Sequence, residues 1–125
     1  MIVTKLAGGL GNQLFAYAAG RYLAYKHNTE LKIEKESLEA QKHPLTYYQL
    51  GVFNIQENFA SKEEVAKLKL IKEEQFIHFI PEILDSPDDI VLDGCWQSWK
   101  YFSPIENILH NEITLKNPLS PICKG

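Results

Sequence analysis

The sequence has few cysteines and no long hydrophobic run, and each scarcity excludes a class of protein. The two cysteines, Cys95 and Cys123, form no CxxC pair, so we expect reduced thiols and no disulfide framework. Met1 leads directly into apolar residues without a basic, signal-like start, and no apolar stretch is long enough to cross a bilayer. These features predict a cytoplasmic protein and leave room for a peripheral contact with the inner membrane.

Positive charge is also scarce. Lysine and arginine together number 13 against 16 acidic residues, for a net charge of -3, and Arg21 is the only arginine. No basic run provides the charged face that a nucleic-acid-binding protein needs, so we expect no nucleic-acid partner. The histidines stand apart in sequence and no Asp-x-Asp pattern occurs, so no metal site is expected.

The composition that remains is that of one globular domain, with 125 residues of which 45% are hydrophobic and 23% charged. The run Ile2–Leu6 predicts a buried strand that enters a glycine turn. Asn12 is expected to cap a helix from Gln13 to about His27, and Thr29–Glu34 predicts a second strand. Strand, helix and strand form a βαβ unit, which indicates an α/β fold with a Rossmann-like parallel sheet.

Cap and turn signals predict the later elements. Ser61 and Glu64 form a capping box before an expected helix whose core face would use Val65, Leu68 and Ile71. The expected elements are an extended stretch at Tyr47–Phe53, a helix at Lys62–Ile71, strands at Phe76–Ile80 and Ile90–Leu92, and a helix from Ser103 to about Ile113. The tail has two prolines and no periodicity, so we expect a domain over residues 1–115 and a linker over 116–125.

The glycine turn Gly8–Gln13 is the main candidate for chemistry. It joins a strand to a helix N-terminus, where backbone N–H groups and the helix dipole favour an anion such as phosphate. The glycines permit positive φ and close approach, and the amides of Asn12 and Gln13 can donate to phosphate or sugar oxygens. The same residues are also explained by a plain turn and a helix cap. A dinucleotide fingerprint fits poorly, because its third glycine position is Leu14. Glu34 stands near the position of the acidic residue that binds ribose in that fingerprint. An exposed Glu at a strand end without such a role is, however, the commoner case.

A second cluster covers Asp93–Phe102, between a strand and a capped helix. Its aromatic rings could stack on a sugar or base, and Gln97 could donate hydrogen bonds. The alternative is that the rings fill the core; we favour it for Tyr101 and Phe102 and leave Trp96 and Gln97 open. For the pair Asp88 and Asp89, a turn or strand-edge role is favoured over metal binding.

These segments carry a family resemblance. Residues 8–15, continued by 17–21, and the segments 93–98 and 100–102 are similar, in the same order, to bacterial-type alpha-1,2-fucosyltransferases. Residues 48–50 and 53–55 fit the pattern more loosely. That family is distantly related to protein O-fucosyltransferases, which have a Gly-Arg-Phe-Gly-Asn-Gln turn near the reacting groups.

The resemblance implies the N-terminal half of a two-domain, GT-B-like glycosyltransferase. Such an enzyme transfers fucose from GDP-fucose to the 2-hydroxyl of a terminal galactose on a glycan, with inversion, no cofactor and no essential metal. It points to Asn12 as the catalytic residue, and Gly9 stands where the related turn has Arg. The expected substrate-binding residues are Gly8, Gly9, Gly11, Gln13, Trp96 and Gln97.

One family feature is missing from the chain. The His-x-Arg-Arg-x-Asp motif, a basic site for the GDP diphosphate, does not occur in these residues. We therefore expect the chain to be inactive alone. Two alternatives stay open, namely a small nucleotide-binding α/β protein and a non-catalytic module that pairs with another chain or self-associates through an exposed face.

Overall fold

A parallel sheet forms the centre of the molecule. The computed structural model describes residues 1–40, 48–55, 57–72, 81–94, 96 and 98–114. Over these residues the strands are β1 (Ile2–Lys5), β2 (Leu31–Glu34), β3 (Lys69–Lys72) and β4 (Ile90–Asp93). They form a four-stranded sheet in the order β2-β1-β4-β3, and all its neighbours are parallel. The α/β class and the parallel, Rossmann-like sheet expected from the sequence are therefore confirmed.

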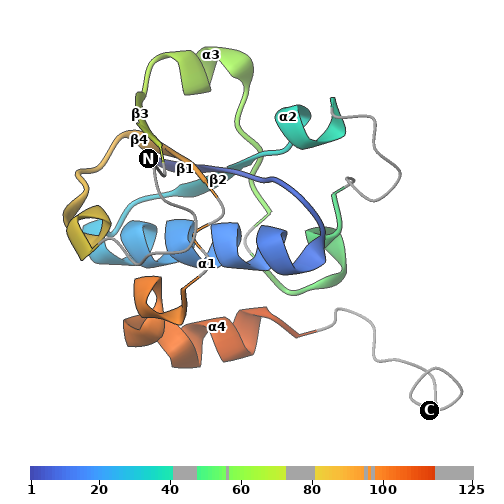
Figure 1. Ribbon diagram of the computed structural model, residues 1–125, viewed down its shortest axis with the longest axis vertical. Helices are drawn as coiled ribbons and strands as arrows, with labels where there is room; N and C mark the ends of the chain where they lie inside the picture. Colours follow the sequence, from blue (N-terminus) through green and yellow to red (C-terminus); the bar gives the residue numbers. More distant parts are fainter. Residues whose placement is uncertain (41–47, 56, 73–80, 95, 97, 115–125) are drawn as a thin grey trace, which may run out of the picture.

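Helix α1 (Leu10–His27) runs along one face of this sheet (Figure 1). Its contact side is built from small residues: Ala16, Ala19 and Gly20 are all buried. A Cβ on Gly20 would lie 3.0 Å from both Leu31 Cδ1 and Thr4 Cβ, so close packing explains this glycine. Thr4 Oγ1 also donates to the Ala16 carbonyl oxygen at 2.8 Å, which joins the strand to the helix.

The expected start of this helix was wrong. The helix begins at Leu10, its N-cap is Gly9, and no side chain caps it. Asn12 therefore lies inside the first turn and is not the cap. The physical reason is Gly8, whose φ of +69° turns the chain early enough for Leu10 and Gly11 to become helical.

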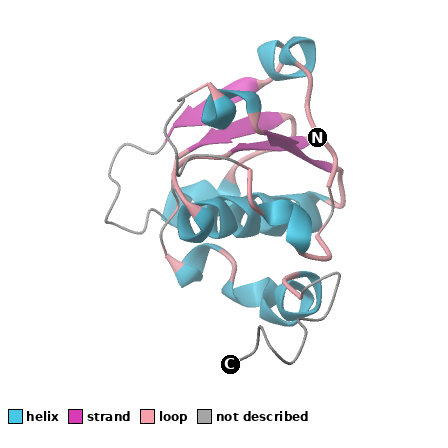
Figure 2. Ribbon diagram, turned by 90° about the vertical axis from the view of Figure 1, so that its right-hand side faces the viewer, coloured by secondary structure: helices cyan, strands magenta, loops and turns pink. Residues whose placement is uncertain are grey.

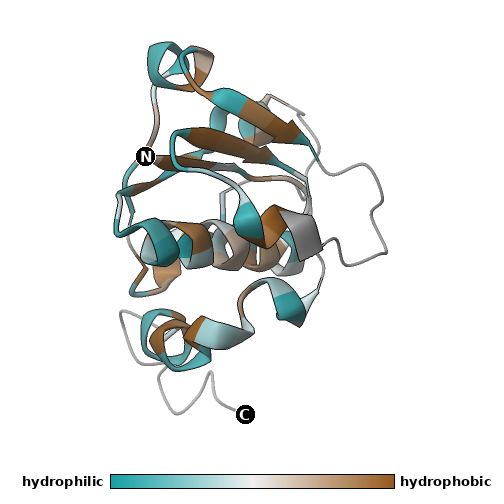
Figure 3. Ribbon diagram, turned by 90° about the vertical axis from the view of Figure 1, so that its left-hand side faces the viewer, coloured by the Kyte–Doolittle hydropathy of each residue, from teal (hydrophilic) through white to brown (hydrophobic). Residues whose placement is uncertain are grey.

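The strands alternate between two cores. Ile2, Ile33 and Leu92 belong to the large core on the side of α1, whereas Val3 and Val91 point to the opposite face. That second face packs against Ala60 and the short helix α3 (Lys62–Ala66). Hydrophobic colouring along much of the sheet in Figure 3 reflects this burial on both faces, which is typical of parallel sheets.

A further layer lies on the side of α1 away from the sheet (Figure 2). It contains the 3-10 turns η3 (Trp99–Tyr101) and η4 (Ser103–Ile105), followed by helix α4 (Glu106–Glu112). Glu112 accepts a hydrogen bond from the Tyr17 hydroxyl at 2.5 Å and pairs with Arg21 Nε at 3.0 Å. The side chains of Arg21 and Glu112 are each only 14% exposed, so this pair fastens α4 to α1.

Several expectations for the middle of the chain need correction. The capping box of Ser61 and Glu64 is confirmed, but α3 ends at Ala66, so Ile71 lies in β3 and not on a helix face. Residues 50–52 form the 3-10 turn η1 (Leu50–Val52) instead of an extended stretch. The helix expected from Ser103 is present as η4 and α4. The remaining elements are α2 (Glu36–Glu39) and η2 (Pro81–Asp85), and the strand expected at 76–80 lies outside the described residues.

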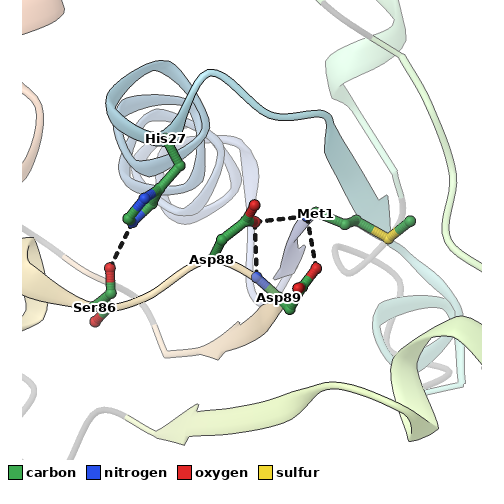
Figure 4. A network of polar contacts seen from close by, with 5 residues as sticks. All are labelled: Met1, His27, Ser86, Asp88 and Asp89. Atoms are coloured by element: carbon green, nitrogen blue, oxygen red, sulfur yellow. Dashed lines mark hydrogen bonds and ion pairs between the residues drawn. The ribbon is translucent and has the colours of Figure 1, made fainter.

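The chain start is held at the amino end of the sheet (Figure 4). The Met1 ammonium group lies 2.6 Å from Asp88 Oδ1 and 3.0 Å from Asp89 Oδ1. Nearby, His27 Nε2 donates to the Ser86 carbonyl oxygen at 2.7 Å. Asp88 and Asp89 thus have a structural role beside β4, as favoured from the sequence.

This ion pair predicts a pH-dependent contribution to stability. Burial lowers the pKa of the Met1 amino group, but hydrogen bonds to Asp88 and Asp89 outweigh burial and raise this pKa above 8.0. Burial raises the pKa of Asp88, and the Met1 ammonium outweighs it and holds this pKa below 3.8. The Met1 contribution is therefore complete below pH 8.0 and is lost as pH rises through the raised pKa. The Asp88 contribution is complete above pH 3.8 and is lost as pH falls through the lowered pKa.

The variant Asp88→Asn should lose about 1 kcal/mol or less of the free energy of unfolding, because the pair is partly exposed. The loss should be greatest between pH 3.8 and pH 8.0, the ordinary pKa values of the Asp88 carboxyl and the Met1 amino group. It should shrink at higher and lower pH. Urea unfolding of both proteins across this pH range measures it. A loss that does not vary with pH would contradict the ion-pair explanation.

Two glycines of α1 should respond oppositely to alanine. Gly20→Ala should lower the free energy of unfolding by about 1–2 kcal/mol, because overpacking outweighs the gain in helix propensity. Gly11 is the matched control: its Cβ would meet nothing within 4 Å. Gly11→Ala should therefore raise stability by about 0.5 kcal/mol. Thermal unfolding of the two variants gives the comparison, and stabilisation by both would disprove the close packing of α1.

Candidate functional site

The two motif-bearing segments leave the sheet side by side. The glycine turn follows β1 and the aromatic segment follows β4, and these strands are parallel neighbours. Lys5 and Asp93, their last residues, are register partners, and Lys5 Nζ lies 3.9 Å from Asp93 Oδ2. Ligands of open α/β sheets bind outside the carboxyl ends of the strands. The structure thus brings together two segments that are more than eighty residues apart in the sequence.

Gly8 is the one glycine of the turn that the backbone requires. Its φ of +69° lies in the left-handed region, and an added Cβ would come within 2.4 Å of Asn12 Nδ2. Gly9 and Gly11 differ, because an added Cβ would meet nothing within 4 Å at either position. The backbone therefore does not need glycine at 9 and 11, whereas a ligand that lies against the turn would benefit from it.

Gln13 is fully buried and ties the turn to another loop. Its Nε2 donates to the Gly8 carbonyl oxygen at 3.1 Å, and its Oε1 accepts from the Gln49 backbone N–H at 2.9 Å. The side chain thus spans from the turn to the segment before η1. This geometry makes Gln13 a residue that shapes the turn, and its side chain is not exposed to a ligand.

Asn12 occupies the first turn of α1 and is partly exposed. The first turn has no acidic residue and the N-cap provides no side-chain hydrogen bond. Backbone N–H groups at a helix start have no intrahelical acceptor, and the helix dipole adds positive potential. The exposed Gly11 therefore lies where a negatively charged or hydroxyl-rich ligand would be favoured, and the Asn12 Nδ2 lies close to Gly8 in the same turn.

The aromatic segment contributes mainly to packing. Trp96 is fully buried, has a φ of +51°, and packs edge-on against Tyr101 with ring centroids 5.6 Å apart. Its ring is covered, so the arrangement favours the core-filling interpretation left open for Trp96. Tyr101 is also buried, as expected, whereas Phe102 is only half-buried and its ring lies 5.9 Å from that of Phe15. Gln97 lies outside the described residues.

An apolar groove adjoins the turn and was not predicted from the sequence. It has a volume of about 570 Å³ and runs between α1 and the layer of η4 and α4. Gly11, Leu14, Phe15 and Phe102 line it. The signal that could have found it is the wide apolar surface of α1, since Leu14 and Phe15 stay only partly buried.

The described part of the chain has neither a metal-ligand cluster nor a helix that could span a membrane. Over those residues, no three His, Cys, Asp or Glu side chains gather as metal ligands would. No helix in the same residues combines the length and apolarity that a membrane span requires.

Comparison with protein-family models, with curated proteins and with solved structures found no match.

The bridging role of Gln13 is testable by an isosteric change. Gln13→Met keeps the volume and removes both hydrogen bonds, which leaves the part-buried Gly8 carbonyl and Gln49 N–H without this partner. We expect a loss of about 2 kcal/mol or more in the free energy of unfolding, measured by urea denaturation. Leu10→Ala, at an exposed position of the same helix, is the control and should change stability by less than about 0.5 kcal/mol. Equal effects of the two changes would contradict the bridge.

Proposed function

We propose that this chain is the N-terminal half of a two-domain, GT-B-like alpha-1,2-fucosyltransferase. In the complete enzyme, fucose passes from GDP-fucose to the 2-hydroxyl of a terminal galactose. The observation that carries this proposal is the meeting of the two family-like segments at the carboxyl edge of β1 and β4. A cytoplasmic location agrees with two cysteines that suggest no disulfide framework.

Each exposed part of the turn has a distinct role in this proposal. Gly9 and Gly11 leave space for the donor to lie against the backbone. The Asn12 amide donates a hydrogen bond to an oxygen next to the reacting centre, where fixed donors stabilise developing negative charge. Gly8 and Gln13 act indirectly, because they hold the turn in the conformation that exposes Gly11 and Asn12.

The donor diphosphate needs further residues. Arg21, the sole arginine, is bound to Glu112 and is only 14% exposed. It therefore does not offer the bidentate clamp with which arginine holds phosphates. We propose that the His-x-Arg-Arg-x-Asp segment of the family supplies that clamp from outside these residues, and that the chain alone transfers no fucose.

The apolar groove supports one alternative, a module that pairs with another chain. Its lining of Leu14, Phe15 and Phe102 is apolar surface that a second domain or chain would cover. The two proposals differ in what they require of the turn: pairing needs no ligand at Gly9 or Gly11. Sedimentation at increasing concentration detects self-association, and binding at the turn separates the enzyme from a plain module.

An amide NMR titration tests the proposed donor site. GDP-fucose should shift the amide signals of residues 8–13, and it should do so more strongly than GDP, with NADH as a third ligand. Gly9→Ala adds a methyl group in open space at a φ of -84°, which alanine tolerates, so the fold should persist. Binding should nevertheless weaken by about ten-fold, because the methyl group keeps the donor from the backbone.

Leu70→Ala is the control for this titration, since Leu70 is 52% exposed on the edge strand β3. It should leave the GDP-fucose response unchanged. Shifts produced by NADH alone would favour the nucleotide-binding alternative. Absence of shifts at residues 8–13 with every ligand would contradict a donor site at the turn.

A further inference from the structure

A second pocket lies at the carboxyl ends of β1 and β2. It has a volume of about 420 Å³, within the range of small-molecule sites. Lys5 and Glu34, the last residues of these strands, line it together with Ser37 and Lys62. It is therefore at the ligand-binding edge of the sheet but uses no residue of the glycine turn.

The central group of this pocket is the Glu34 carboxylate. The sequence favoured an exposed Glu at a strand end, but Glu34 is only 7% exposed. Its Oε1 accepts from the Ser37 backbone N–H at 2.9 Å and its Oε2 accepts from the Ser37 hydroxyl at 2.8 Å. A carboxylate has about four acceptor positions, so these two bonds fix its orientation and leave each oxygen able to accept another.

The charges around the pocket favour an uncharged ligand. Lys5 Nζ lies 3.9 Å from Asp93, and Lys62 Nζ lies 3.8 Å from Glu36. Because both lysines face carboxylates, the lining has no surplus positive charge for a phosphate. An oriented, buried carboxylate with free acceptor positions instead matches a ligand with two neighbouring hydroxyl donors.

We propose that this pocket binds a sugar through a vicinal diol whose two hydroxyl groups donate to the Glu34 carboxylate. A hexose of a glycan and the ribose of a nucleoside share this chemistry. The site goes beyond the fucose transfer proposed above, because it depends on Glu34 and Ser37 and not on residues 8–13. The acidic residue after the second strand has the same task in dinucleotide-binding folds, although the turn here lacks their third glycine.

Amide NMR with the 125-residue chain tests the proposal with four uncharged ligands. Methyl β-galactoside and adenosine carry a vicinal diol, whereas methyl 3-deoxy-β-galactoside and 2′-deoxyadenosine each lack one hydroxyl and retain no vicinal diol. At least one diol ligand should shift the amides of residues 34–37 and 62–66, and its deoxy partner should bind about ten-fold more weakly. Whether galactoside or adenosine binds identifies the source of the sugar.

Two charge-matched variants locate the contact. Glu34→Gln should weaken binding of the diol ligand by about ten-fold, because an ionised acceptor is replaced by a neutral amide. Glu39→Gln makes the same charge change at a side chain that is 49% exposed and does not line the pocket, so it should leave binding unchanged. The comparison with the deoxy ligands uses the unaltered chain. It therefore tests whether the pocket binds a diol even if Glu34→Gln does not fold. No shift with either diol ligand, equal binding of the deoxy ligands, or equal effects of the two Gln variants would overturn the proposal.

Discussion

The close contact between α1 and the sheet is the constraint on which the rest of the structure depends. Gly20 approaches Leu31 and Thr4 so closely that a Cβ would lie 3.0 Å from each. This contact fixes where α1 begins relative to β1, and hence where the glycine turn projects. It also leaves the opposite side of α1 to the layer that Tyr17, Arg21 and Glu112 fasten in place. The sheet edge, the groove and the turn therefore share one helix as their common support.

The sequence predicted those parts of the fold whose signals are local. The strand, glycine turn and helix at the start follow from hydrophobic runs and glycines, and the capping box at Ser61 appears with both of its hydrogen bonds. Helix ends were less predictable, because Asn12 is a good cap by type but Gly8 starts the helix earlier through its positive φ. Ile71 fits a helix period equally well, yet pairing with β4 places it in a strand. Such pairings are long-range and leave no local signal.

The sequence predicted which segments form the candidate site, but not how these segments are arranged in space. Motif resemblance selected residues 8–13 and 93–102, and the strand order then made them neighbours. Chemical type alone did not separate residues that contact a ligand from residues that support the turn. Gln13 has an amide that could bind a ligand, but this amide forms hydrogen bonds with Gly8 and Gln49. Trp96 is buried in the core. Glu34 shows the reverse: an ordinary strand-end residue by sequence is a buried, oriented carboxylate in a pocket.

The central claim is that a sugar nucleotide lies against the turn between β1 and α1. Intermolecular NOEs between GDP-fucose and the isotope-labelled chain test it most directly, because they report direct contacts and not remote shifts. A donor bound at the turn should give NOEs to the Gly9 and Gly11 protons and none to Trp96, whose ring is buried. NOEs confined to another surface, or a bound donor without NOEs to the turn, would contradict it.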